Sequence, residues 1–162
     1  MKLHFLSLLL ISFLVTSCGD NRVRKKNFAP PIPGFLVTGC YYIVDDSTAI
    51  KRSFTGDNGT ETYYLNPDPI FTVGDFQEVK LNDDNGRYAL NIILNEKGTK
   101  AFAAATKKYT GKMLAFVIYN RLVMAPRVVG EISGGKIEIT GGYETEKYKE
   151  LFKRIDSEMY EQ

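Results

Sequence analysis

From residue 35 onward the chain breaks into short apolar and β-branched stretches separated by turn residues, and this pattern limits the fold most. The stretches are 35–44, 49–54, 60–65, 76–81 and 87–94, with turns at Asp45-Asp46-Ser47, Gly56-Asp57-Asn58-Gly59 and Asn82-Asp83-Asp84-Asn85-Gly86. Strands of this length joined by short polar turns pair as antiparallel hairpins. We expect residues 38–43 to form an accessory strand at the edge of the sheet, and Pro67 and Pro69 to break the pairing around residues 70–73.

A helix is expected to follow the strand-rich half. Asn95 is a suitable N-cap for a helix ending near Tyr109, with Phe102, Ala105, Thr106 and Tyr109 along one stripe. Gly98 lies in its first turn, where glycine costs about 1 kcal/mol relative to alanine. We therefore expect another part of the chain to approach Gly98 closely.

The last third of the chain predicts a hairpin, a short strand and a second helix. Residues 112–119 and 122–128 are expected to pair around Asn120-Arg121, and residues 136–140 turn Ile137 and Ile139 to one face. The second helix covers residues 145–159. Its apolar stripe is Tyr148, Leu151, Phe152, Ile155 and Met159. Such a stripe packs on a sheet, so the predicted class is α+β, with a mainly antiparallel sheet and two helices.

The first seventeen residues are typical of a secretory signal. Lys2 precedes an apolar run of about ten residues, too short for a bilayer span, which needs about 20. The run ends in Leu14-Val15-Thr16-Ser17-Cys18, which resembles the lipobox of bacterial lipoproteins. The resemblance implies cleavage before Cys18 and lipidation of its thiol, with residues 1–17 as the signal peptide. The alternative is a soluble secreted protein in which Cys18 is incidental.

Residues 18–35 are expected to form a flexible tether that is basic and proline-rich. It holds Arg22, Arg24, Lys25 and Lys26, followed by three prolines in the stretch 30–33. Residues 36–162 carry 16 basic and 18 acidic side chains, so the folded part has a net charge of −2. The pI of 8.4 therefore reflects the tether, and a nucleic-acid partner is not expected.

The predicted mature chain contains no combination of side chains that specifies catalysis. Its only histidine, His4, lies in the signal, so the usual base near neutral pH and the usual zinc and copper sites are not expected. Cys40 is left without a disulfide partner if Cys18 is lipidated, and we expect a small buried hydrophobe there. The acidic turn 82–86 lacks the spacing of a calcium loop. No catalytic residue, cofactor or metal ligand is predicted, and we expect a non-enzymatic protein.

A resemblance to a known family runs in order through the second half of the chain. The stretches that carry it are LNEKGTKAF (94–102), GKMLAFVI (111–118), VMAPRV (123–128), ISGG (132–135) and ITGGY (139–143). They are similar to segments of the head of the first periplasmic domain of SecD, part of the bacterial SecDF protein-export machinery. The resemblance covers about residues 62–155. It implies a ferredoxin-like α+β unit, with 36–162 as one SecD-head-like domain, that holds emerging polypeptide outside the membrane.

The departures from SecD make the shared fold a firmer expectation than the shared function. SecD couples export to the proton gradient through transmembrane helices, which the predicted mature chain lacks, and fold alone does not carry function. We predict a lipid-anchored envelope protein that binds polypeptide and assists its export or folding outside the cytoplasm. The partner would be taken as an extended strand at a sheet edge.

The alternative hypothesis is a surface lipoprotein of interaction or immunity type that recognises one folded partner. Both hypotheses place the protein in the cell envelope, anchored through Cys18 to the outer membrane on its periplasmic or surface face. The outer leaflet of the inner membrane is the other location left open. Most of the aromatic rings, including Phe102, Phe116 and Phe152, are expected to fill the core rather than contact a partner.

Overall fold

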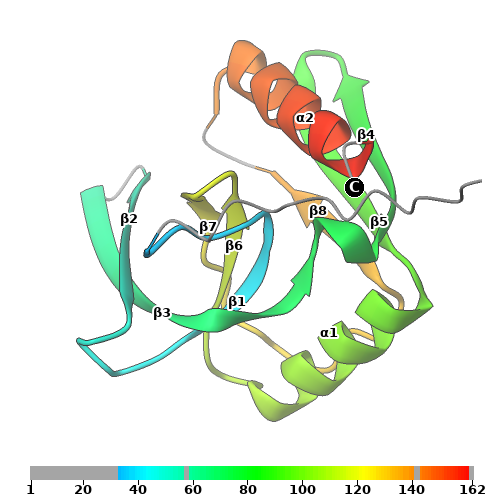
Figure 1. Cartoon of the computed structure of the whole chain (residues 1–162). Helices are drawn as coiled ribbons and strands as arrows, with labels where there is room; N and C mark the ends of the chain where they lie inside the picture. Colours follow the sequence, from blue (N-terminus) through cyan, green and yellow to red (C-terminus); the bar gives the residue numbers. More distant parts are fainter. Residues whose placement is uncertain (1–32, 57–58, 141–142, 161–162) are drawn as a thin grey trace, which may run out of the picture. The chain divides into compact units, whose positions relative to one another are not determined.

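The computed structural model describes residues 33–56, 59–140 and 143–160, in which β1 to β5 precede helix α1 and β6 to β8 precede helix α2 (Figure 1). The elements in chain order are β1 (Gly39–Ile43), β2 (Ile50–Gly56), β3 (Gly59–Thr72), η1 (Val73–Asp75), β4 (Phe76–Asp84), β5 (Arg87–Leu94), α1 (Glu96–Lys108), β6 (Leu114–Ile118), β7 (Arg121–Met124), β8 (Lys136–Ile139) and α2 (Thr145–Tyr160). The predicted signal 1–17, with Cys18, and most of the tether 18–35 lie outside the described residues. The α+β class with antiparallel pairing is confirmed, in two sheets rather than one.

The five-stranded sheet has the order β2-β3-β1-β6-β7, and β1 is its middle strand. Gly39 of β1 lies opposite Thr72 on one side and Val117 on the other. The prediction of an edge position for this strand is therefore wrong. Cys40 and Tyr41 point to opposite faces and both are buried, which is the pattern of an interior strand rather than an edge.

Strand β3 continues past Pro67 and Pro69, and Phe71 and Thr72 are paired with β1, so the prolines disturb the register without ending the pairing as predicted. Tyr41 pairs with Pro69, and register shifts flank this position on both sides. The irregular pairing accommodates the missing proline N–H, because prolines occur in sheets at bulges. As a result β3 carries Phe71 into the core beside Cys40.

The edges of this sheet approach each other, because the sheet curls strongly (Figure 1). Arg52 of β2 reaches the turn between β6 and β7, where its Nε donates to the carbonyl oxygen of Asn120 at 3.1 Å. The turn residues are Tyr119 and Asn120, which both have positive φ, and Arg121 already pairs with Ile118. The predicted turn at Asn120-Arg121 is thus one residue late, since Tyr119 and Asn120 have the positive φ values that a type I′ hairpin turn takes at both positions.

The second sheet has the order β4-β5-β8, and helix α2 packs against β4 and β5. The β4–β5 hairpin closes at Asn85-Gly86, within the turn predicted from the sequence. Tyr148, Leu151 and Ile155 of α2 are buried against the sheet, as the apolar stripe predicts. Phe152 and Met159 border the same core and are partly buried.

Helix α1 begins as predicted, with the Asn95 side chain accepting a hydrogen bond from the Gly98 N–H at 2.9 Å. The expected close approach to Gly98 comes from Asp75, since a Cβ added to Gly98 would lie 2.9 Å from the Asp75 Cβ. Asp75 is buried, pairs with Lys97 Nζ at 2.9 Å and accepts from the Thr72 N–H at 3.1 Å. Asp75 thereby joins the end of β3 to the start of α1.

Cys40 is completely buried in the main core, as predicted for a small hydrophobe. Burial raises the pKa of its thiol far above the ordinary range, because the thiolate would lose its hydration. The described residues include no helix both long and apolar enough to span a bilayer.

Substitution of Gly39 tests the central position of β1. An added Cβ would collide with the carbonyl oxygen of Phe71, a backbone atom of the paired strand. We expect Gly39→Ala to lower the free energy of unfolding by about 1–3 kcal/mol, as measured by urea denaturation. Gly134→Ala is the matched control, because nothing lies within 4 Å of its added Cβ. A Gly39→Ala protein as stable as the control would contradict the interior placement of β1.

Candidate functional site

An apolar groove of about 480 Å³ lies where β8, an edge strand of the smaller sheet, faces the end of β7. Its lining includes Lys136 to Glu138 and Thr140 at β8, and Met124, Ala125 and Pro126 at the end of β7. Phe54 of β2 and Ile132 of the β7–β8 connection complete its walls. Strand β2 and the stretch 124–140, which are far apart in the sequence, therefore meet around one hollow.

The floor of the groove consists of two core aromatic rings, Phe102 of α1 and Phe116 of β6. Their centroids are 6.1 Å apart in an edge-to-face arrangement, and the Phe71 ring lies 5.5 Å from that of Phe102. Both residues are almost fully buried, which confirms that they belong to the core. The groove is therefore an opening onto the main hydrophobic core rather than a patch above it.

Strand β8 presents alternating side chains beside this floor. Ile137 and Ile139 are buried, whereas Lys136 and Glu138 are exposed. One side of β8 pairs with β5, with Ile137 opposite Ile92. No described strand pairs with its other side, which faces the groove.

Two residues of β8 turn their backbone N–H and C=O groups toward the groove. The Leu94 N–H donates to the carbonyl oxygen of Gly135 at 2.8 Å, which fixes how hydrogen-bonded and non-hydrogen-bonded pairs alternate along β5 and β8. Ile137 then directs its N–H and C=O toward β5. Lys136 and Glu138 direct theirs away from β5, toward the groove.

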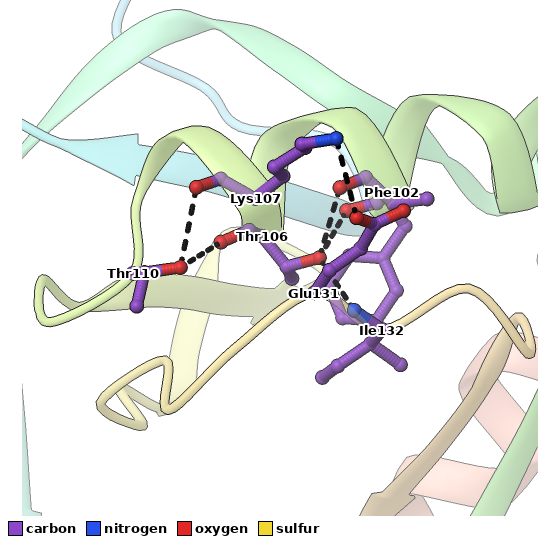
Figure 2. A network of polar contacts seen from close by, with 7 residues as sticks. Phe102, Thr106, Lys107, Thr110, Glu131 and Ile132 are labelled. Atoms are coloured by element: carbon purple, nitrogen blue, oxygen red, sulfur yellow. Dashed lines mark hydrogen bonds and ion pairs between the residues drawn. The ribbon is translucent and has the colours of Figure 1, made fainter.

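A buried threonine holds the connection that carries Ile132 (Figure 2). The Thr106 hydroxyl donates to the Phe102 carbonyl oxygen at 2.8 Å and accepts the Ile132 N–H at 2.9 Å. Thr106 has no exposed surface, so this acceptor is not replaced by water. Lys107 and Glu131 add an exposed ion pair at 3.6 Å, of the kind that contributes little to stability.

The sequence predictions placed no residue of this groove in a site. Cys18 lies outside the described residues, and Cys40 is buried in the core. Within the described ranges, no three His, Cys, Asp or Glu side chains gather as a metal site would require. Thr106 was predicted only as part of a core stripe. A polar threonine in a core-facing stripe indicates a buried hydroxyl that needs a hydrogen-bond partner.

Comparison with known proteins matches residues 48–157 to the SecDF P1 head subdomain family. The chain is 41% identical over 69 residues to the protein translocase subunit SecD of Rickettsia felis, covering 43% of this chain and 13% of that protein. It is 30% identical over 83 residues to SecD of Acidaminococcus fermentans, covering 51% of this chain and 20% of the relative.

A solved structure described as a membrane component, SecDF, that enhances protein export superimposes with a TM-score of 0.53. The two chains are 28% identical, and the match covers 58% of this chain and 43% of that one. A crystal structure of SecDF in a super-membrane-facing form gives a TM-score of 0.52 at 28% identity, covering 58% of this chain and 13% of the other.

The chain therefore belongs to the SecDF P1 head subdomain family. It spans only about an eighth to a fifth of the length of the SecD relatives described above. The groove lies within the matched region, since its residues run from Phe54 to Thr140.

Substitution of Thr106 tests how the groove wall is held. Thr106→Val keeps the shape but leaves the part-buried Ile132 N–H without its protein acceptor, so we expect a loss of about 0.5–1.5 kcal/mol in unfolding free energy. Thr106→Ser keeps the hydroxyl and removes one methyl group, so we expect a loss of about 0.8 kcal/mol. The diagnostic measurement is hydrogen exchange of the Ile132 amide, which should become faster in Thr106→Val but not in Thr106→Ser. Equal exchange in both variants would show that Thr106 does not hold the connection.

Proposed function

We propose that this protein is a non-enzymatic, polypeptide-binding domain that works outside the cytoplasm and assists protein export or folding there. The observation that carries the proposal is the apolar groove floored by Phe102 and Phe116 beside the unpaired side of β8. An unfolded chain offers apolar side chains for such a floor and unpaired backbone groups for such an edge.

Membership of the P1 head family supports the link to protein export. The relatives are named as subunits of a protein translocase, and one solved structure is described as enhancing protein export. Because this chain matches only a small part of those proteins, the proposed role is that of the head alone. The activity of a complete translocase subunit is not assigned to it.

Binding rather than catalysis is favoured by the side chains of the folded part. Residues 36–162 contain no histidine, and burial keeps the Cys40 thiol protonated and out of reach of a substrate. The groove itself contributes phenylalanine, methionine, alanine, proline and isoleucine side chains, with Lys136 and Glu138 at its border.

The N-terminal region supports attachment of this domain to a membrane of the cell envelope. Lipidation of Cys18 would fix the chain to the outer membrane or to the outer leaflet of the inner membrane, since several acyl chains anchor stably. Residues 18–35 would then give the domain a reach on the order of 50 Å at ~3.1 Å per residue. This reach would let the groove meet chains at a distance from the membrane surface.

A charge placed on the groove wall is expected to weaken polypeptide binding. Ile132→Glu would force a carboxylate to lose water when a ligand fills the groove, so we expect roughly tenfold weaker binding of a permanently unfolded model protein. Titration by fluorescence anisotropy with the purified full chain measures the effect. Val129→Glu is the control, because this residue lies in the same connection, is 91% exposed and does not line the groove.

Two results of this titration would contradict the proposal. The first is an absence of binding by a folded, unsubstituted chain. The second is an equal loss in the Ile132→Glu and Val129→Glu variants, which would indicate a general charge effect. Capture of one stoichiometric folded partner instead of unfolded chains would favour the alternative role, a module that recognises a single protein.

Substitution of Cys18 tests the proposed anchor. Cys18→Ser removes the thiol that would be acylated and with it the cleavage that the lipobox implies, so we expect the variant to keep residues 1–17 and to carry no acyl chain. Mass spectrometry of the unsubstituted protein should show acyl chains on its N-terminal cysteine. Asn21→Ser, just beyond the lipobox, should remain with the membranes. An N-terminal cysteine without acyl chains in the unsubstituted protein, or a Cys18→Ser variant cleaved like the unsubstituted one, would rule out the lipid anchor.

A further inference from the structure

We propose that the groove binds an extended polypeptide segment as an added antiparallel strand on β8, and that Lys136 and Glu138 select its charges. The proposal rests on the polypeptide-binding function and specifies how that site recognises its ligand. The ligand is a segment in which apolar residues alternate with charged ones, and a basic residue precedes an acidic one by two positions.

The backbone of β8 supports strand addition. Lys136 and Glu138 direct their N–H and C=O groups toward the groove, and among the described strands none accepts them. The groove lies along this side of the strand, so the edge opens onto a hollow. Every pairing within the same sheet is antiparallel, and antiparallel pairs are slightly more stable per residue than parallel ones. An incoming strand is therefore expected to run antiparallel to β8.

The two faces of β8 determine which positions of the ligand must be apolar. A ligand residue opposite Ile137 points to the same face as that buried side chain, toward the floor formed by Phe102 and Phe116. A ligand residue opposite Lys136 or Glu138 points to the exposed face. The added strand would therefore be apolar at every second position.

Charge complementarity sets the order of the polar positions. Lys136 and Glu138 are exposed, and neither forms an ion pair within the described part of the chain. Opposite charges directly across two strands attract, and like charges repel. Because the ligand runs antiparallel, it meets Glu138 before Lys136. The favoured order from N- to C-terminus is apolar, basic, apolar, acidic.

Two peptides of one composition test this order. One contains Val-Lys-Phe-Glu and the other Val-Glu-Phe-Lys, each blocked at both ends and extended by neutral polar residues. Anisotropy titration with the purified full chain should give binding of the first about three- to tenfold tighter. The doubly substituted chain Lys136→Glu with Glu138→Lys keeps the net charge and should reverse the preference.

N-methylation of single peptide bonds provides a second, independent readout. In antiparallel pairing with β8, the lysine and glutamate of the first peptide direct their N–H groups toward Glu138 and Lys136. Methylating the lysine N–H should weaken binding at least tenfold, because a backbone hydrogen bond is lost and the methyl group collides with β8. Methylating the phenylalanine N–H, which points away from β8, should change binding less than threefold.

The possible outcomes separate this proposal from the general polypeptide-binding function. Binding of both peptides with equal affinity and no N-methyl pattern would overturn strand addition and leave polypeptide binding standing. Preference for the second peptide would overturn the antiparallel order. No binding of either peptide or of an unfolded model protein would overturn both proposals. A last outcome concerns the chain without peptide. If its Lys136 and Glu138 amides are protected from hydrogen exchange, and more so at higher protein concentration, the edge pairs with a second copy of the chain. That result would overturn the proposal of a peptide ligand.

Discussion

The ring of Phe71 joins the two sheets and helix α1 into one core. Its centroid lies 5.5 Å from the Phe102 ring of α1, 6.1 Å from the Phe76 ring of β4 and 6.2 Å from the Phe116 ring of β6. Aromatic pairs at such separations add about 0.5–1.5 kcal/mol each beyond the area they bury. Phe71 reaches this position because β3 continues past Pro67 and Pro69. The order of the five-stranded sheet and the packing of the second sheet both depend on that continuity.

The groove lies between the end of β7 and strand β8, beside this aromatic cluster. The chain leaves β7 at Met124 and reaches β8 only at Lys136, and on the way Ile132 is hydrogen-bonded to Thr106 of α1. This connection keeps β7 and β8 apart and leaves part of Phe102 and Phe116 as the floor of the groove. Close packing closes most openings of this kind in a protein interior. Because the buried Thr106 side chain holds the connection through its hydrogen bond to Ile132, the groove is a feature that the fold stabilises at this place.

Local patterns predicted most of the elements, but pairing partners and the groove depend on distant contacts. The Asn95 cap and the α2 stripe were read correctly because capping and amphipathic periodicity depend on residues within a few positions. The central place of β1 depends on β3 and β6, which lie far along the chain. Lys136 and Glu138 alternate with isoleucines as in any half-buried strand, so no local signal distinguishes an edge that faces a groove from one that faces solvent.

Strand β8 is short, and its length limits how tightly an added strand could be held. Only Lys136 and Glu138 turn backbone groups to the groove, and each offers one donor and one acceptor. A backbone hydrogen bond contributes about 0.5–1.5 kcal/mol net, whereas association costs at least about 4 kcal/mol in lost freedom of motion. Much of the affinity must then come from the apolar side chain above Phe102 and Phe116. Because any large apolar residue can fill that place, binding would be weak, broad in sequence and quickly reversed. The proposed function requires these properties, because a domain that binds a polypeptide during export must also release it.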